Sequence, residues 1–284
     1  MINKYYINSK NNENIICTLC PHFCLLKEEE RGKCFVRQAK NNEIILESYG
    51  HLTHISVEPI EKKPFLHFLE GSKTLSIAHK GNCNLQCNFC ENFEYTQSQN
   101  TNIESKYFSP EDIVLLAKKE ECRSICMTYN EPTIYYEYLM DLKKECHLNN
   151  LFFIIKTNAY INYKPWADIC FATDAMTLDW KGTDEDYKRF GAEKYIIKNR
   201  IQEAGNRGVH LEISIPLHYY FTKKIDVFHN FGKFLSSIDK KIPVHLLKIY
   251  PANKDEIYPT TSKEFVTDVQ KILSDYLDNI HIFD

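Results

Sequence analysis

The sequence lacks long apolar runs, and its composition shows no excess of basic residues. No stretch of about 18 apolar residues occurs in the 284 residues, so no membrane span is predicted. The start, residues 1–13, is polar and asparagine-rich and lacks the apolar core of a secretory signal. Lysine and arginine number 35 against 38 aspartates and glutamates, and no basic block alternates with aromatic residues. These absences predict a cytoplasmic protein that binds neither membrane nor nucleic acid.

Several familiar motifs are also missing. There is no Ser–His–Asp order, no Walker loop and no dinucleotide-binding glycine motif. No Gly/Ser-rich linker interrupts residues 74–284. The length therefore suits one large domain with a small appendage.

Cysteine, by contrast, is abundant. Eleven cysteines without a secretory signal favour a reducing compartment and metal sites over disulfides. Three of them, Cys83, Cys87 and Cys90, follow the spacing C-x3-C-x2-C. Four cysteines usually hold a 4Fe–4S cluster, so three would leave one iron open for a small molecule. The alternatives are a zinc site that lacks one ligand, or three buried core cysteines.

A second group of cysteines lies near the start of the chain. Cys17, Cys20, Cys24 and Cys34 are spaced C-x2-C-x3-C-x9-C, which suffices to close a tetrahedral metal site. The segment is short and loop-rich, so a metal would have to stabilise it. Zinc, a single iron and an auxiliary iron–sulfur cluster all remain open, and the alternative is four unliganded cysteines.

From residue 74 onward, apolar β-rich segments alternate with amphipathic ones, which favours parallel strands with helical crossovers. The predicted strands are 75–78, 124–129, 151–158, 175–181, 210–216 and 244–251, preceded by a short strand at 43–49. The predicted helices are 109–120, 133–148, 193–206, 225–238 and 262–277. Six such units predict an α/β fold with an open, partial (β/α)6 TIM-type barrel. We expect residues 1–70 to form the four-cysteine module and a connector, and residues 71–284 to form the barrel.

Chemistry in parallel α/β folds collects at the carboxyl ends of strands. Here these ends carry Glu131, Asn158, Asp179 and Lys181. Each has an ordinary explanation by itself, such as a helix-start carboxylate for Glu131 or a local ion pair for Asp179 and Lys181. Together they favour a binding site.

Two further stretches leave alternatives open. Residues 57–68 contain two prolines and read either as a connector around the barrel entrance or as a source of substrate-binding residues. The substrate-binding candidates there are Lys62, Lys63 and His67. Cys126 is either a hydrogen donor or, more simply, a small buried residue.

The chain resembles radical S-adenosylmethionine (SAM) enzymes of the pyruvate formate-lyase activating-enzyme type. It is most similar to the AmmeMemoRadiSam system radical SAM enzymes. The motifs that carry the resemblance are Cys17 to Cys34, Glu58 to Phe68, the cysteine loop through Asn92, Thr128 to Thr133, Thr157-Asn158 and Asp174 to Gly182. The resemblance implies that Cys83, Cys87 and Cys90 bind three irons of a 4Fe–4S cluster and that SAM binds the fourth.

The same resemblance implies roles for other residues. Phe89 would pack near the adenine, and Tyr129, Asn130 and Glu131 would replace the Gly-Gly-Glu segment that holds the SAM ammonium. Asn158, Asp179 and Lys181 would line the SAM and substrate site. Glu212 and His245, carried by the fifth and sixth strands, are added as candidate cofactor-binding residues.

The sequence departs from the family pattern at two motifs. Gly81 lies one residue earlier than the usual Gly-Cys-Asn start, and the family's Thr-Asn-Gly reads Thr157-Asn158-Ala159. Larger relatives also continue past the last helix, which puts functions of that tail in doubt.

The resemblance implies an oxidoreductase-type enzyme. It cleaves SAM to methionine and a 5′-deoxyadenosyl radical, which abstracts hydrogen from a small-molecule, peptide or protein substrate. The expected electron donor is a flavodoxin or ferredoxin, in an anaerobic setting. One alternative is an activase that makes a glycyl radical on a partner protein. From another class, the alternative is a non-catalytic metal- or SAM-binding protein.

Overall fold

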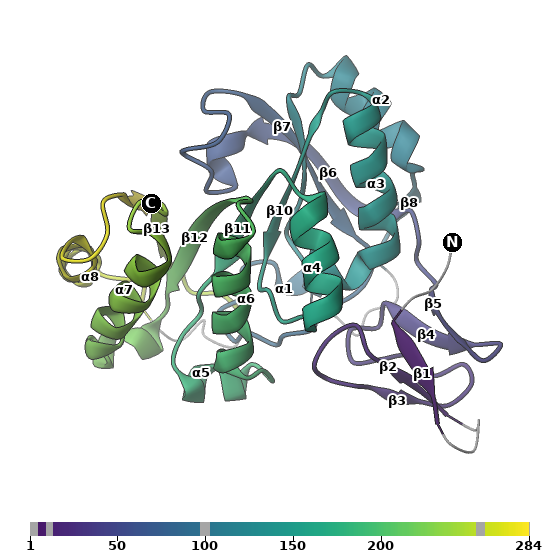
Figure 1. Ribbon diagram of the computed structural model, residues 1–284, viewed down its shortest axis with the longest axis horizontal. Coiled ribbons are helices and arrows are strands. Elements are labelled where there is room, and N and C mark those ends of the chain that lie inside the picture. The colour runs from purple at the N-terminus through teal and green to yellow at the C-terminus, as the bar shows by residue number, and fades with distance from the viewer. Residues whose placement is uncertain (1–4, 10–13, 97–102, 254–258, 284) are drawn as a thin grey trace.

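The structure is a computed structural model, and it describes residues 5–9, 14–96, 103–253 and 259–283. Its centre is a nine-stranded sheet with the order β14-β13-β12-β11-β10-β9-β7-β6-β8 (Figure 1). The strands are β6 (His51–Pro59), β7 (Lys73–His79), β8 (Lys106–Tyr107), β9 (Ser124–Met127), β10 (Phe152–Thr157), β11 (Ala175–Asp179), β12 (His210–Leu217), β13 (Val244–Lys248) and β14 (Ile280–Phe283). Strand β7 and strands β9 to β14 run parallel to one another. Strand β6 pairs antiparallel with both of its neighbours, β7 and β8.

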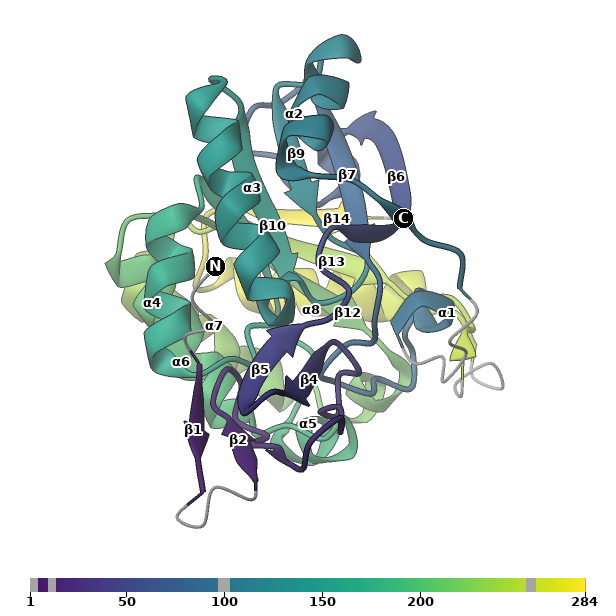
Figure 2. The same cartoon turned by 90° about the vertical axis from the view of Figure 1, so that its right-hand side faces the viewer.

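Helices connect the parallel strands and cover the outer side of the sheet (Figures 1 and 2). They are α1 (Phe93–Thr96), α2 (Pro110–Lys119), α3 (Tyr136–Leu148), α4 (Tyr163–Ala172), α5 (Asp184–Arg189), α6 (Lys194–Asn206), α7 (Asp226–Asp239) and α8 (Lys263–Ser274), with 3-10 turns η1 (Ile60–Lys62), η2 (Pro132–Tyr135) and η3 (Tyr219–Lys223). Ser109 caps α2 in a capping box with Asp112, as the Ser-Pro-Glu-Asp sequence predicts.

The predicted α/β fold with six strand–helix units is confirmed. Each of β7, β9, β10, β11, β12 and β13 leads through a helix to the next parallel strand. Several elements were not predicted. They are helices α1, α4 and α5, the antiparallel strands β6 and β8, the short strands β1 to β4, and β14, which adds a seventh parallel strand next to β13. The predicted strands ending at 129, 181 and 251 are two or three residues too long, because β9, β11 and β13 end at Met127, Asp179 and Lys248.

The segment after β6 lies at the amino end of the barrel, so the expectation that it wraps the entrance is wrong. Ile60 and Phe65 pack with Cys126, Ile154 and Ala175 in one buried cluster. Phe68 contacts the ring of Phe152, the first residue of β10. The physical reason is apolar burial, because this segment fills the end of the barrel opposite the loops that carry the cysteines.

The amino-terminal module consists of β1 (Tyr6–Asn8), β2 (Ile15–Cys17), β3 (Leu25–Leu26), β4 (Arg37–Lys40) and β5 (Glu43–Leu46). Strands β1, β2 and β3 form one small sheet, and β4 and β5 form a hairpin. Figure 1 shows the module as a separate unit at the lower right, below the ends of α3 and α4. The domain boundary at residue 70 remains a prediction; β6 itself pairs with β7 in the large sheet.

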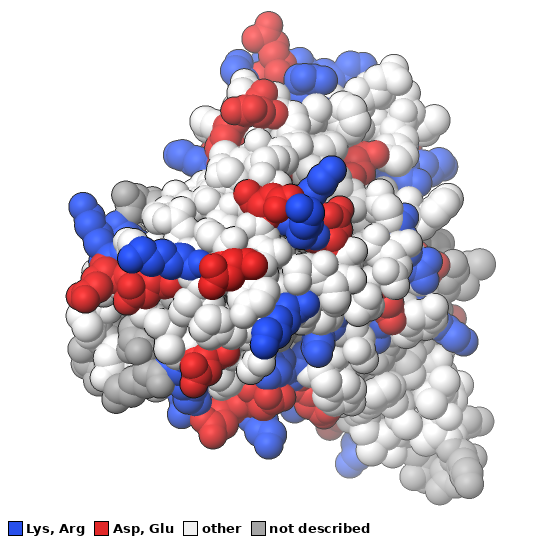
Figure 3. Space-filling view, turned by 60° about the vertical axis from the view of Figure 1, so that its left-hand side comes forward, with Lys and Arg blue, Asp and Glu red and all other residues white. Residues whose placement is uncertain are grey.

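None of the helices in the described ranges has the length and apolar character that crossing a membrane requires. On the face that Figure 3 shows, acidic and basic side chains are interspersed. Of the polar start, residues 1–4 and 10–13 lie outside the described residues.

Candidate functional site

The loop after β7 brings three thiols to one cavity at the carboxyl end of the sheet. Cys83, Cys87 and Cys90 all line it, as do residues from the ends of β9, β10, β11 and β13. The cavity has about 820 Å³ of empty space, part of which is open to solvent. The loop is anchored by backbone bonds from Cys83 to Thr96 (2.8 Å) and from Gln86 to Phe190 (3.0 Å).

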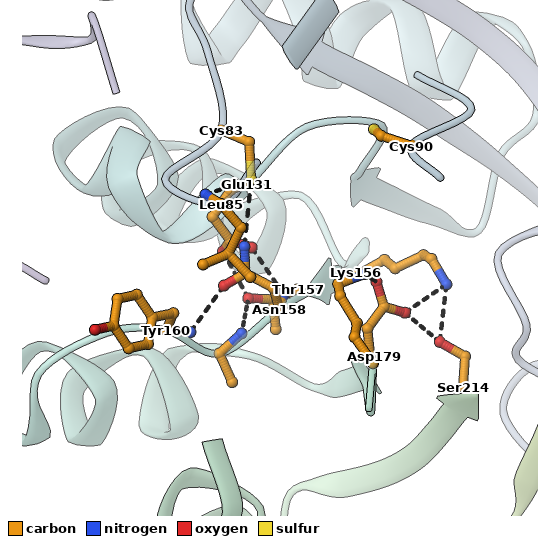
Figure 4. A network of polar contacts seen from close by, with 12 residues as sticks. Cys83, Leu85, Cys90, Glu131, Lys156, Thr157, Asn158, Tyr160, Asp179 and Ser214 are labelled. Atoms are coloured by element: carbon orange, nitrogen blue, oxygen red, sulfur yellow. Dashed lines mark hydrogen bonds and ion pairs between the residues drawn. The ribbon is translucent and has the colours of Figure 1, made fainter. Parts of the chain in front are cut away.

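Hydrogen-bond donors surround these sulfur atoms. The backbone N–H of Leu85 and the side-chain amide of Asn158 both lie 3.3 Å from the Sγ of Cys83 (Figure 4). The Thr96 hydroxyl lies 3.3 Å from the Sγ of Cys90. Donors of this kind stabilise thiolates that ligate a metal. Burial raises the pKa of the Cys87 thiol to about 12, and the nearby Lys181 charge opposes that rise.

Glu131 is a buried carboxylate that ties together the ends of two strands. It accepts bonds from the hydroxyl of Thr157 (2.6 Å), the N–H of Asn158 (2.8 Å) and the N–H of Thr133 (3.0 Å). Burial raises the pKa of Glu131, and these three donors oppose that rise. The carboxylate therefore orients the end of β10 and the start of η2, and its oxygens already have partners within the protein.

A charged group from three neighbouring strands forms one wall of the cavity (Figure 4). Asp179 at the end of β11 pairs with Lys156 (2.9 Å) and with Lys181 (2.6 Å). The Ser214 hydroxyl donates to the same carboxylate and accepts from Lys156. Although burial favours the neutral acid, the two lysines hold the pKa of Asp179 well below its usual range. Two cations share one carboxylate here, so this wall carries a net positive charge.

Three further predicted residues border the cavity. Tyr129 has a φ of 70° and forms a tight turn in which Asn130 N–H bonds Thr128 C=O at 2.9 Å. Asn130 holds the turn against β7 by donating to the His79 carbonyl (2.6 Å). Phe89 stacks on His218 at 4.5 Å between ring centroids. The structure thus brings together Phe89, Tyr129, Asn130, Glu131, Asn158, Asp179, Lys181 and the three cysteines.

Glu212 and His245 do not line this cavity, which contradicts their expected place with the cofactor residues. Glu212 is the third residue of β12 and so lies near the amino end of the barrel. It accepts bonds from His245 (2.5 Å), His210 (2.8 Å) and the backbone N–H groups of Leu66 and His67 (3.1 Å each). Its position within the strand, and not only the strand that carries it, decides which end of the barrel it faces.

The four amino-terminal cysteines line a second, small enclosed space. Cys17, Cys20 and Cys34 are buried and Cys24 is half-buried. Among the described residues, no three His, Cys, Asp or Glu side chains are placed around a single-ion position. The structure therefore gathers all four predicted ligands around one space, and both the presence and the kind of a metal there remain predictions.

Three residues of the site were not predicted as site residues. Lys156 and Glu91 line the cavity, and the Ser214 hydroxyl donates to the Asp179 carboxylate. A signal for Lys156 was present, because it lies two residues before Asn158 on a strand and so points to the same face. Glu91 is an exposed loop residue next to Cys90, and nothing in its own sequence pattern indicates a role.

Comparisons with known proteins identify the class. The family model described as Radical SAM superfamily matches residues 77–231 of this chain. A protein of Methanocaldococcus jannaschii, described as uncharacterized protein MJ0808, is 30% identical over 256 residues, covering 89% of this chain and 76% of that one. The chain belongs to the Radical SAM superfamily.

Solved structures match this chain at low identity, and those with a TM-score above 0.5 are similar to it in fold alone. SuiB of Streptococcus suis bound to SAM is 17% identical with a TM-score of 0.55, over 72% of this chain and 48% of that one. A domain of a pyruvate-formate lyase-activating enzyme from Bacteroides vulgatus is 19% identical with a TM-score of 0.49, over 57% of this chain and 99% of that one. Superfamily membership supports SAM cleavage by an iron–sulfur cluster as the activity of this class.

Proposed function

We propose that this protein is a radical SAM enzyme that abstracts hydrogen from an organic substrate bound in the cavity. The observation that carries the proposal is the convergence of three thiols on one cavity that also holds Lys156, Asp179 and Lys181. When bound, the cluster and SAM supply a 5′-deoxyadenosyl radical. The residues present fit such a cluster, because each thiol borders the cavity and two of the sulfur atoms have donors nearby.

In this proposal Cys83, Cys87 and Cys90 hold three irons and leave the fourth to SAM. Lys181 offsets the negative charge of the thiolates, since its charge acts on both Cys87 and Cys90. Tyr129 and Asn130 form the SAM-facing turn, and Phe89 provides an apolar surface for the adenine. Glu131 acts indirectly by fixing Asn158, because its oxygens are already bonded.

The substrate side of the cavity is polar. The charged side chains of Lys156 and Glu91 line it. A substrate with hydrogen-bonding or charged groups fits this lining better than a hydrocarbon. The second candidate function is action on a peptide or partner protein, including glycyl-radical activation. The similar fold of SuiB bound to its precursor peptide SuiA, with a TM-score of 0.53, supports this candidate.

The proposal has three further components. A one-electron donor such as flavodoxin or ferredoxin is the family's usual source of reducing power. A metal at the amino-terminal cysteines, either zinc or a second iron–sulfur cluster, is supported by the common space that the four thiols line. A cytoplasmic setting agrees with the eleven free cysteines.

The decisive experiment replaces Cys87 with alanine in anaerobically reconstituted protein. Loss of the thiolate should abolish SAM-dependent formation of 5′-deoxyadenosine and the shift of the reduced-cluster EPR signal on SAM addition. Cys146→Ala is the matched control, since Cys146 is buried in α3 outside the cavity lining. Retained turnover in Cys87→Ala would overturn the proposal, and wild-type protein that binds SAM but never forms 5′-deoxyadenosine would favour the non-catalytic alternative.

A further inference from the structure

The amino-terminal module contains a buried cation next to its thiols. Arg37 is 1% exposed and pairs with Glu137 of α3 through two bonds of 2.7 and 2.9 Å. Arg37 also lines the space that the four cysteines share, and its charge acts on the Cys17 thiol. Its Nε, which is buried, has no hydrogen-bond partner within the described residues.

An unpaired, buried N–H of a cation carries a desolvation penalty unless an acceptor reaches it. Glu137 already binds the other two guanidinium nitrogens, so its carboxylate leaves the Nε group free. A metal held by thiolates would supply the missing negative charge, because four thiolates outweigh a divalent ion by two charges. The unpaired group is thus an observation, independent of the cysteine spacing, that points to an anionic centre in this space.

The module touches the barrel at the loop that carries Cys83. The N–H of Asn82 donates to the carbonyl of Cys34 at 3.0 Å, and His22 Nε2 lies 2.7 Å from the carbonyl of Asn84. One of the four cysteines, Cys34, and His22, which lines the same space, therefore bond the residues on either side of Cys83. Glu137 adds a third connection, since it lies on α3, which follows directly after the turn of Glu131 and η2.

Close packing at Gly81 strengthens this junction. Gly81 has a φ of 127°, and a Cβ at this position would lie 2.4 Å from Cγ2 of Val36. Only glycine lets the module approach the loop at this distance. The amino-terminal module and the cysteine loop of the barrel therefore meet at Gly81, where the sequence departs from the family's usual Gly-Cys-Asn start.

We propose that the four cysteines of the module hold a thiolate-bound metal centre, and that this centre fixes the Cys83 loop through the Cys34–Asn82 and His22–Asn84 contacts. Arg37 and Glu137 are positioning residues for the metal, because Arg37 offsets the charge of its thiolates. Zinc and an iron–sulfur cluster share this chemistry, and metal analysis distinguishes them. The metal site does not depend on the radical SAM assignment of the barrel, whereas the effect on cluster assembly rests on that proposed function.

The first experiment uses the full chain with Cys83, Cys87 and Cys90 all replaced by alanine. This variant cannot form the barrel cluster, so any metal it retains belongs to the module. Zinc, iron and acid-labile sulfide are measured after anaerobic purification. About one zinc per chain, or about four irons with matching sulfide, supports the proposal and identifies the metal. A metal-free chain overturns it, and the result does not depend on the radical SAM assignment.

The second experiment tests the connection to the loop by hydrogen exchange in the same triple variant. Removal of the metal by a chelator should speed exchange of the peptide spanning residues 80–86 by about tenfold or more, because Asn82 N–H loses its ordered acceptor. The peptide spanning residues 210–217, within β12, should not change and so reports that the barrel persists. Equal exchange of the 80–86 peptide with and without metal would overturn the coupling.

The third experiment tests whether the Arg37–Glu137 ion pair stabilises the metal site or only the packing of the fold. Replacing the ion pair by Arg37→Met together with Glu137→Leu removes both charges and leaves an apolar contact, a change that folded proteins often tolerate. We expect the chain to fold but to release its metal to a competing chelator about 10- to 100-fold more readily, as for other residues that contact metal ligands. Unchanged metal retention in a folded variant would show that the pair serves only packing and would remove Arg37 from the proposal.

Discussion

The side-chain amide of Asn158 donates to the Sγ of Cys83 across 3.3 Å. Asn158 follows β10 and Cys83 follows β7, so this contact links loops that β9 separates in the sheet. The same amide also donates to the Oδ1 of Asn84 (3.0 Å), which places its N–H groups firmly on the cysteine loop. Asn158 is therefore bonded to the ligand loop, a role that the family resemblance alone did not indicate.

The first prediction concerns the reduction potential of the cluster. Asn158→Ala removes a hydrogen-bond donor to the Cys83 thiolate. The reduced cluster carries one more negative charge than the oxidised cluster, so loss of this donor destabilises the reduced form more. We expect the potential to fall by about 50 mV, the one-electron equivalent of a hydrogen bond worth about 1 kcal/mol. A redox titration followed by EPR measures it, with Asn206→Ala at the exposed end of α6 as control. An unchanged potential with lost SAM binding would instead place Asn158 in direct contact with SAM.

The second prediction separates two roles for Glu131. The Glu131 carboxylate accepts three hydrogen bonds, and in Glu131→Gln an amide replaces it. The N–H₂ group of the amide cannot accept a hydrogen bond, so at least one buried donor faces another donor. We expect the free energy of unfolding to fall by about 1–3 kcal/mol and SAM binding to weaken with it. Denaturant unfolding and calorimetric SAM titration test this. Normal stability with abolished SAM binding would mean that the carboxylate contacts the SAM ammonium, as the resemblance implies.

Much of this site follows from the sequence because its residues sit at strand ends, where the parallel fold itself places them. Glu131, Asn158, Asp179 and Lys181 were predicted from their places at strand ends, the three cysteines from their spacing, and Asn130 from the family resemblance. All of them line the cavity, and their roles in binding the cluster and SAM remain predictions. Glu212 was misplaced because the sequence shows which strand carries a residue more clearly than how far along the strand it lies. The place of residues 60–69 at the amino end of the barrel was also not predicted, because their apolar partners Cys126, Ile154 and Ala175 are distant in the sequence.

The pairing of Arg37 with Glu137 shows a second limit. The two residues are 100 positions apart, and each alone reads as an ordinary charged residue of a strand or an amphipathic helix. Their burial follows only from packing of the module against α3. The same is true of His79, whose neutral ring is enclosed by contacts that no local pattern records.

The third prediction concerns acid sensitivity. Burial lowers the pKa of His79 to about 4, while its contacts with the Glu131 and Lys80 carbonyls oppose that shift. The unfolded chain binds this proton near pH 6.5, so stability is lost as the pH falls below 6.5. Between pH 7 and pH 5 the loss should be about 2 kcal/mol from this group.

His79→Gln keeps a donor for the Glu131 carbonyl but cannot titrate. Between pH 7 and pH 5, the free energy of unfolding of this variant should therefore fall by about 2 kcal/mol less than that of the wild type. Unfolding curves at both pH values measure the difference. His147→Gln, at the more exposed end of α3, serves as control. Parallel pH profiles for wild type and His79→Gln would contradict the prediction.

The fourth prediction tests the junction of module and cysteine loop. Gly81→Ala adds a Cβ that meets Val36 Cγ2 at 2.4 Å, in a backbone conformation with φ of 127°. Backbone strain and overpacking should together lower the free energy of unfolding by about 2–4 kcal/mol. Iron content after reconstitution should fall as well, because the module can no longer hold the loop in place.

A double-mutant cycle with Val36→Ala isolates the overpacking. Val36→Ala relieves the clash but not the backbone strain, so Gly81→Ala and Val36→Ala should show a favourable coupling energy of about 1 kcal/mol or more. Gly191→Ala is the matched control, because Gly191 also has a positive φ, 81°, but no atom within 4 Å of the added Cβ. It should show strain without coupling to Val36→Ala. If Gly81→Ala behaves like Gly191→Ala in this cycle, the close contact between the module and the loop does not limit stability, and the coupling of the two metal sites loses its structural basis.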